Sequence, residues 1–382
     1  MMRAFVIFSV ILVHTLAFFD VQATPGSISN LGLDMLTMNF HFTRETFMLI
    51  TGVVLFYTYY DRQHAILSFW RKRITLIAIP YVAWTAIYYA FEGTYVPGFS
   101  WAPAVLLPKF GASLLSANMF FLYFLMVSMQ FYVLFPLALK FMKKVENHLG
   151  WVFAVSFVIE VAILYVNQVY IDPAQWKFSS PFINLLIHHR DELIFTYQFW
   201  FIAGAIISIK YAQIRDWVWS HTKLVLGAVV LMVLLLWATY FLTHQVFHFV
   251  DWIAVDTLQP IMVPYSLVVS IGLWFIGMKW ARVRATANMR RTSRIIQFFG
   301  GVSFGIFLFQ PLALHYTEAI DYHVHWHGFA HYLLIPFTAI GSYVLSAVGA
   351  YVVSKIPYLS YIVGEKTNLR RRVDKASATQ TV

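Results

Sequence analysis

Cysteine is absent from this chain of 382 residues. Its absence excludes disulfide bonds, thiolate metal sites and an acyl-enzyme formed on cysteine. Charge is also scarce, because Asp, Glu, Lys and Arg make up only 12% of the residues, about half of the share in an average soluble protein. There is no internal repeat and no Walker-type phosphate loop, which argues against an ATP-driven pump.

The chain is instead rich in apolar residues. Hydrophobic residues form 60% of the chain and the mean hydropathy is +0.68. This composition indicates an integral membrane protein, and we predict an all-α, polytopic fold of about ten transmembrane helices. The predicted spans lie near residues 4–21, 45–60, 74–91, 113–139, 150–168, 193–209, 223–243, 259–278, 296–316 and 329–354.

Lys and Arg residues fall on alternate connections between these spans. One side holds only Arg44, Lys109, Lys177 and Arg190, and the other side holds the rest of the 27 Lys and Arg residues. The positive-inside rule then places the basic side, with both termini, in the cytoplasm. The net charge of +10 therefore indicates topology in a multi-pass plasma-membrane protein embedded in the lipid bilayer, and we expect no nucleic-acid partner.

The chain reads as one membrane domain with a short tail. We predict a transmembrane domain over residues 1–364 and a basic cytoplasmic tail over 365–382. Three long connections on the outer side, at 22–44, 92–112 and 169–192, contain Pro, Gly, Asn and Trp, and we expect structured re-entrant or surface loops there.

Two polar residues share a face of the first span. Arg3 and His14 are eleven positions apart, which is about three helical turns plus roughly 20° and a rise of about 16 Å. If Arg3 lies at one membrane interface, His14 lies near the middle of the ~30 Å hydrocarbon core. A buried neutral imidazole can act as a general base, so we predict chemistry on a molecule that reaches in from one side of the membrane.

Other polar side chains lie within or at the ends of predicted spans. Charge at this depth costs about 3 kcal/mol, so each such residue needs a partner or a task. Glu160 is a candidate catalytic residue, or simply a hydrogen-bonded buried carboxyl. Arg44 and Glu45 open the second span, either as an interfacial ion pair or with Arg44 turned inward to the site. Gln130 and Gln310 are expected to hydrogen-bond between helices.

Histidines gather in one outer connection. His323, His325, His327 and His331 are close in sequence, but Asp321 is the only acidic residue near them and cysteine is absent. We therefore predict no metal, and a hydrated rim that contacts sugar explains the cluster at least as well. The same interpretation applies to His188 and His189.

At these residues the chain resembles the acyltransferase-3 family of integral membrane acyltransferases. Arg3 and His14 match the family's first-span Arg-x10-His signature. Further segments are similar in order: TFMLITGVVL resembles the second-span F-F-x-x-S-G stretch, FWRKRITLIAIPY the basic start of the third span, FFLYFLMVSMQFYVLFP the fourth span, and GGVSFGIFLFQPLAL the late S-Y-G-I-Y-L-x-H-P segment. Within the family the chain looks closest to the Gram-positive branch that includes the poly-N-acetylglucosamine O-succinyltransferase once regarded as an exporter.

The resemblance implies a fold and an activity. It implies a ten-span helical protein that moves an acyl group, typically acetyl, from cytoplasmic acyl-coenzyme A to a hydroxyl of a cell-envelope polysaccharide or glycolipid. Proteins of envelope-glycan synthesis would be further partners. We expect Arg3, Arg71 and Arg73 to bind the donor's phosphates and His14 to act as the general base. Arg44 and Glu160 are added as candidate catalytic residues because of their predicted place in or at the end of a span, not because of the resemblance.

Two departures from the family pattern concern the substrates. Leu76 stands where the family's Arg-x-x-Arg would place a second cation after Arg73, and Gln310 replaces the late histidine. Neither departure touches Arg3 or His14.

Two other functional classes stay open: an exporter of polysaccharide or glycolipid without acyl transfer, and a non-catalytic membrane subunit of an envelope synthase. Labelled acyl-coenzyme A distinguishes them, because only an enzyme transfers the label to a glycan.

Overall fold

The computed structural model describes residues 1–62, 65–173, 180–324 and 329–365 of the chain. In these residues the regular secondary structure is helical, which confirms the predicted all-α class. The predicted tail at 365–382 lies outside the described residues except for Glu365. The helices are α1 (Met2–Val21), α2 (Ile28–Phe40), α3 (Phe42–Tyr59), α4 (Ile66–Tyr95), α5 (Pro103–Ser116), α6 (Tyr123–Lys144), α7 (Leu149–Val166), α8 (Pro181–His188), α9 (Gln198–Ile209), α10 (Tyr211–Ser220), α11 (Thr222–Phe241), α12 (Asp251–Ala254), α13 (Met262–Val283), α14 (Arg290–Gly301), α15 (Ser303–His323), α16 (Phe329–Tyr332) and α17 (Ile335–Lys355).

Each predicted span falls on helical structure, although spans such as 113–139 and 296–316 are each divided between two helices. Among the described residues, 7 helices are long and apolar enough to cross a membrane, and up to 9 if each of two bent pairs forms one span. The bent pairs are residues 194–209 with α10, at 89°, and residues 287–301 with α15, at 75°. The remaining predicted span, 45–60, is α3, which is less apolar because Arg44 and Glu45 lie in its first turn.

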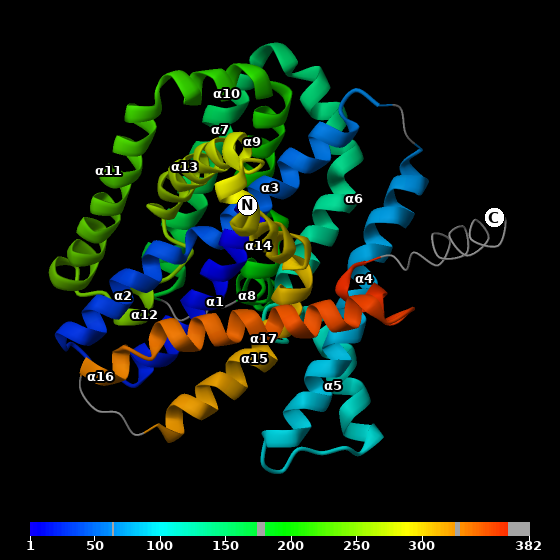
Figure 1. Cartoon of the computed structure of the whole chain (residues 1–382), viewed down its shortest axis with the longest axis vertical. Coiled ribbons are helices and arrows are strands. Elements are labelled where there is room, and N and C mark those ends of the chain that lie inside the picture. Colours follow the sequence, from blue (N-terminus) through cyan, green and yellow to red (C-terminus); the bar gives the residue numbers. More distant parts are fainter. Residues whose placement is uncertain (63–64, 174–179, 325–328, 366–382) are drawn as a thin grey trace.

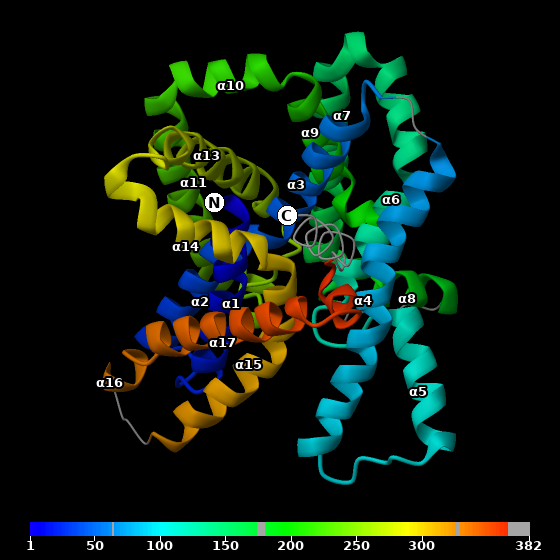
Figure 2. The ribbon, with the colours of Figure 1, turned by 45° about the vertical axis from the view of Figure 1, so that its right-hand side comes forward.

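Helix α1 lies inside the bundle and carries the first candidate residues. It packs against α2, α3, α14, α15 and α17, and Figures 1 and 2 show it behind α17 and beside α2. Its side chains Val6, Ile7 and Ile11 are 0% exposed. An apolar helix that is covered on most sides holds its polar residues at fixed positions inside the protein, so the burial of α1 positions His14.

Close packing of α3 on α9 places the next candidate residues. Gly52 and Gly204 face each other across this contact, and a Cβ added to Gly204 would lie only 2.5 Å from the carbonyl oxygen of Leu49. Small residues let two helix backbones approach in this way. The contact holds α3, and with it Arg44, against the start of α9.

One connection and one predicted span differ from their predicted form. The outer connection 22–44 contains helix α2, which packs on α1, so α2 and α3 are joined at His41 rather than by a loop. The predicted span 113–139 is interrupted: α5 ends at Ser116, and Ala117 and Phe120 adopt left-handed φ values of 50° and 47° before α6 begins at Tyr123. Irregular backbone inside a membrane protein is tolerated where it is covered by protein or lines a cavity.

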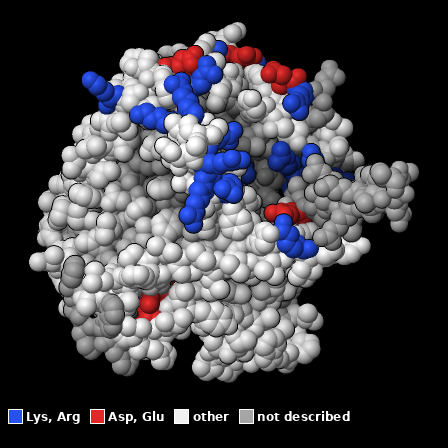
Figure 3. All heavy atoms as spheres, in the orientation of Figure 1, with Lys and Arg blue, Asp and Glu red and all other residues white. Residues whose placement is uncertain are grey.

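Charge is unevenly distributed over the molecule. On the face shown in Figure 3, Lys and Arg side chains gather over the half of the molecule that contains α10 and α14. The exposed arginines Arg290, Arg291 and Arg294 of α14 belong to this half. The opposite end, formed by the α4–α5 hairpin and the end of α15, shows no basic side chain on this face.

Candidate functional site

A cavity of about 210 Å³ lies beside the middle of α1. His14 of α1, His41 at the α2–α3 junction and Arg44 of α3 all line it. The remaining walls come from α6 and the connection before it, from Thr257 between α12 and α13, and from Phe307 of α15. Segments far apart in the sequence thus bring two imidazoles and one guanidinium to a single cavity.

His14 is held by ring packing. Its imidazole stacks on Phe121 with ring centroids 4.1 Å apart. Phe121 belongs to the irregular stretch between α5 and α6, so the broken helix provides the surface on which the imidazole rests. No hydrogen bond to the His14 ring occurs within the described part of the chain, so both ring nitrogens are available to a ligand in the cavity.

Arg44 is the most tightly held side chain of the site. Its Nη2 donates a 2.8 Å hydrogen bond to Thr257 Oγ1, and Nη1 lies 3.3 Å from Asp191 Oδ1. Nε lies 3.5 Å from Glu45 Oε1, and the guanidinium carbon lies 5.3 Å from the centroid of the Tyr197 ring. The side chain is 11% exposed. Arg44 is therefore a fixed positive charge at the cavity wall.

A buried polar network supports the two loops that hold Arg44. Arg190 donates to Asn167 Oδ1 at 2.6 Å and to Asp172 Oδ1 at 3.1 Å, and Asn167 donates in turn to the carbonyl oxygen of Leu258 at 3.1 Å. Burial raises the pKa of the nearby Asp256 carboxyl, and the charge of Arg44 acts against that rise. The network therefore links the segment that contains Asp191 to the segment that contains Thr257, and these two residues are the hydrogen-bond partners of Arg44.

His41 completes the cavity and was missed by the sequence analysis. It was assigned to an outer loop, whereas the structure places it one helical turn before Arg44, with 9% of its surface exposed. Its Nδ1 is buried without a hydrogen-bond partner in the described part of the chain. The spacing of three residues between His41 and Arg44 was the signal available in the sequence, since such residues are neighbours on a helix.

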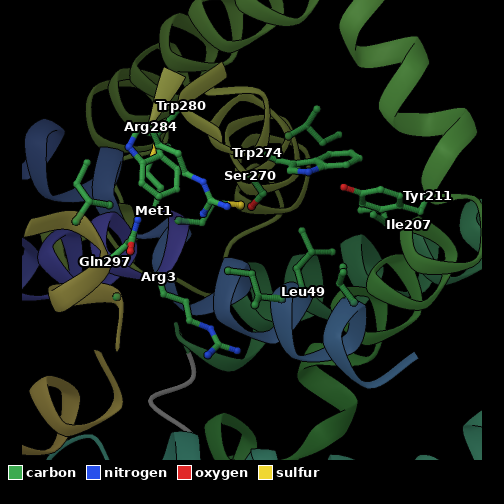
Figure 4. A pocket seen from close by; sticks show the side chains of 16 residues that line it. Met1, Arg3, Leu49, Ile207, Tyr211, Ser270, Trp274, Trp280, Arg284 and Gln297 are labelled. Carbon is green, nitrogen blue, oxygen red and sulfur yellow. The ribbon is translucent and has the colours of Figure 1, made fainter. Parts of the chain in front are cut away.

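Arg3, at the N-terminal end of α1, lines two further cavities. One, of about 310 Å³, is also lined by Phe47, Phe124 and Phe307, the same side chains that line the His14 cavity. The other, of about 500 Å³, adjoins it at Arg3 and Ile50. We call this second space the Arg3 chamber; Figure 4 shows Trp274, Trp280 and Tyr211 around it, and Arg284 also lines it. The 310 Å³ cavity thus shares lining residues with both the Arg3 chamber and the His14 cavity.

The other predicted donor-binding residues lie at different distances from this path. Arg73 lies beside Tyr132, which lines the 310 Å³ cavity with Arg3, and its guanidinium is 5.4 Å from the centroid of the Tyr59 ring. Arg71 is exposed and lies outside the cavities described above.

Glu160 does not line the His14 cavity. Its carboxylate is buried between α7 and α9, where it accepts hydrogen bonds from Gln198 Nε2 at 3.1 Å and from the backbone N–H of Phe199 at 3.3 Å. These contacts fix the first turn of α9, directly after Tyr197, whose ring lies beside Arg44. The geometry therefore connects Glu160 to the site through the position of α9.

The neutral glutamines have different surroundings. Gln130 accepts from the backbone N–H of Ile194 at 3.0 Å and donates to the carbonyl oxygen of Glu192, so it bonds α6 to the connection before α9 rather than to another transmembrane helix. Gln310 is 0% exposed, and neither amide atom has a hydrogen-bond partner among the residues that the structure describes, so the predicted bond between helices is wrong for this residue.

The histidine cluster provides no metal site in the described residues. His325 and His327 lie outside them. Nδ1 of His323 lies 2.6 Å from the carbonyl oxygen of Ala319, and His331 packs on Phe19. Over the described ranges no group of three or more His, Asp or Glu residues could hold a metal ion.

Comparison with known proteins identifies the family. A family model described as an acyltransferase domain, that of the acyltransferase-3 family, matches residues 1–356, which include α1, all residues that line the His14 cavity and all residues that line the Arg3 chamber. No curated protein and no solved structure matches the chain. Because the family model covers nearly the whole helical bundle, the chain belongs to the acyltransferase-3 family and is a membrane acyltransferase.

Proposed function

We propose that the protein transfers an acyl group from cytoplasmic acyl-coenzyme A to a hydroxyl of a cell-envelope carbohydrate or glycolipid, with His14 as the general base. One observation carries the proposal: His14 lines a cavity whose phenylalanine walls are shared with a cavity at Arg3, about 16 Å away along α1. In this proposal a long donor anchored at Arg3 passes between these phenylalanines and so brings its thioester to His14.

The electrostatics support the direction of this path. Arg3 and Arg284 line the Arg3 chamber, and Arg73 lies near the adjoining cavity. Guanidinium groups are suited to phosphates, and Trp274 and Trp280 offer flat apolar surfaces for the donor's base. Arg71, at the surface, would meet the donor as it arrives. The basic half of the molecule would face the cytoplasm, with both termini on that side.

The chemistry requires one proton acceptor and one path for the leaving group. His14 takes the proton of the acceptor hydroxyl as its oxygen bonds to the thioester carbonyl carbon. The carbon–sulfur bond then breaks, and the coenzyme A thiolate leaves with the electron pair and receives the proton from His14. Alignment of both substrates in a narrow cavity reduces the entropic part of the barrier. Arg44 contributes positive charge where the carbonyl oxygen becomes negative.

Purified protein in lipid nanodiscs with radiolabelled acetyl- or succinyl-coenzyme A tests the proposal. N-acetylglucosamine oligomers and whole envelope glycan serve as acceptors, and mass spectrometry identifies the ester. We expect the label in the glycan with the native chain, and at least a hundredfold less with His14→Ala at unchanged donor binding. The control is His315→Ala, because His315 packs on Tyr95 at 4.4 Å, away from the cavity.

Two results would overturn the proposal. Retention of most of the transfer rate in His14→Ala would remove the base assignment. Movement of glycan across the nanodisc or a vesicle membrane without coenzyme A, and without any labelled ester, would favour the exporter.

A further inference from the structure

His41 shares the absence of a hydrogen bond with His14, and its Nδ1 is in addition fully buried. It is 9% exposed, and no hydrogen bond to its imidazole occurs within the part of the chain that the structure describes. By contrast, His323 is near a backbone carbonyl, and Nδ1 of His189 lies 3.5 Å from a Glu192 carboxylate oxygen. A buried polar group without a partner costs about 1–3 kcal/mol, so an unpartnered imidazole in a cavity wall points to a ligand.

The burial of one ring nitrogen determines which one can meet that ligand. Nδ1 is enclosed by protein and has no acceptor nearby, whereas His41 as a whole lines the cavity. Nε2 is therefore the nitrogen that reaches the cavity. A neutral imidazole carries one N–H, and buried N–H groups without an acceptor are rare, so the proton belongs on Nε2. His41 thus presents an N–H donor to the same space as His14.

Arg44 supplies charge to the same space from a fixed position. Nη2 donates to Thr257 at 2.8 Å and Nη1 to Asp191 at 3.3 Å, while Nε lies 3.5 Å from Glu45 Oε1 without a hydrogen bond. These contacts hold the guanidinium at the cavity wall as a positive charge. His14 and His41 both line the cavity with ring nitrogens that no described residue hydrogen-bonds. Because His14 is the proposed base, His41 is the imidazole left to donate.

We propose that His41 Nε2–H donates a hydrogen bond to the thioester carbonyl oxygen of the acyl donor and stabilises the oxyanion formed during transfer. The inference rests on the proposed function and adds a catalytic residue to it. When the acceptor oxygen bonds to the carbonyl carbon and His14 takes the hydroxyl proton, the carbonyl π electrons move to the oxygen that His41 binds. They return as the carbon–sulfur bond breaks, and the thiolate leaves with that bond's electron pair.

The test compares two substitutions at position 41 in the full chain in nanodiscs. His41→Ala removes the donor, and His41→Gln retains an amide N–H of similar reach. We expect His41→Ala to lower kcat about a hundredfold, with little change in the dissociation constant for acetyl-coenzyme A measured without acceptor. We expect the kcat of His41→Gln to be at least tenfold higher than that of His41→Ala. His315→Ala again serves as the matched control, and thermal unfolding verifies that each variant is folded.

The outcomes separate this inference from the proposed function. If the native chain transfers no label from acyl-coenzyme A, the proposed function fails and the inference fails with it. If the native chain is active and His14→Ala is inactive, a His41→Ala variant within threefold of native kcat overturns the oxyanion role alone. An equal fall of kcat in His41→Ala and His41→Gln also overturns the oxyanion role, because the amide N–H of glutamine should stabilise the oxyanion where alanine cannot.

Discussion

Arg44 Nη2 donates to Thr257 Oγ1 at 2.8 Å across 213 positions of sequence. The bond joins α3 to the connection between α12 and α13. Nη1 of the same guanidinium donates to Asp191 Oδ1 at 3.3 Å. A single side chain thereby ties three distant segments around the His14 cavity, and it does so with the forked geometry that only arginine provides.

Replacement of Arg44 by lysine should separate charge from geometry. Lysine retains the positive charge but cannot donate to Thr257 and Asp191 with the same planar fork. We expect kcat for acyl transfer to fall at least tenfold while the chain remains folded. Arg44→Ala should also destabilise the fold by about 3 kcal/mol, because Glu45 is then buried without its partner.

Arg215→Lys is the matched control for this experiment. Arg215 pairs with Asp216 at 2.8 Å, but both side chains are exposed. Its replacement should leave transfer and stability unchanged in the same assay and thermal melt. An Arg44→Lys variant with native kcat would show that charge alone is sufficient at this position.

Arg3 and Arg71 should differ in their effect on the donor. Arg3 lines both the Arg3 chamber and the 310 Å³ cavity that shares walls with the His14 cavity, whereas Arg71 is exposed outside them. A charge-assisted bond to phosphate contributes about 1.5–3 kcal/mol, so we expect Arg3→Ala to raise the KM for acetyl-coenzyme A about tenfold or more. Arg71→Ala should raise it less than threefold. Steady-state kinetics at saturating acceptor measure both, and equal KM values for the two variants would contradict this path.

Gln130 should contribute to stability and to the position of Asp191. It bonds the backbone on both sides of Leu193, at Glu192 and Ile194. Gln130→Leu keeps the shape but leaves a backbone N–H and a carbonyl without a partner, which costs about 1–3 kcal/mol. We expect a lower unfolding midpoint in detergent and a smaller kcat. Gln213→Leu, at an exposed position on α10, is the comparison, and an unchanged midpoint for Gln130→Leu would refute the structural role.

Gly204 should tolerate no side chain. A Cβ at this position would lie 2.5 Å from Leu49 O and 2.8 Å from Val53 N, so α9 would have to move away from α3. Overpacking of this kind costs about 1–3 kcal/mol. We expect Gly204→Ala to melt earlier and to lose transfer activity as Arg44 shifts with α3. Gly227→Ala on α11 is the control, because nothing lies within 4 Å of its added Cβ.

The sequence by itself determined the class of protein and part of the site. Scarce charge and long apolar runs predict helices that cross a membrane, because the backbone N–H and C=O groups inside a bilayer must hydrogen-bond within their own segment. The helical period also placed Arg3 and His14 on one face of α1, and both line cavities that share walls. For Arg44 the sequence left open an ion pair with Glu45 or an inward turn, and the structure shows both, because Arg44 pairs with Glu45 and lines the His14 cavity.

Only the tertiary structure decided what else surrounds His14. His41, Phe121 and Thr257 lie in segments whose local sequence predicts a loop, a continuous span and a span end, and nothing in that local pattern brings them together. The meeting arises because α2 folds back on α1 and the chain breaks between α5 and α6. Such contacts depend on packing between distant helices, whereas periodicity reports only which face of one helix is apolar.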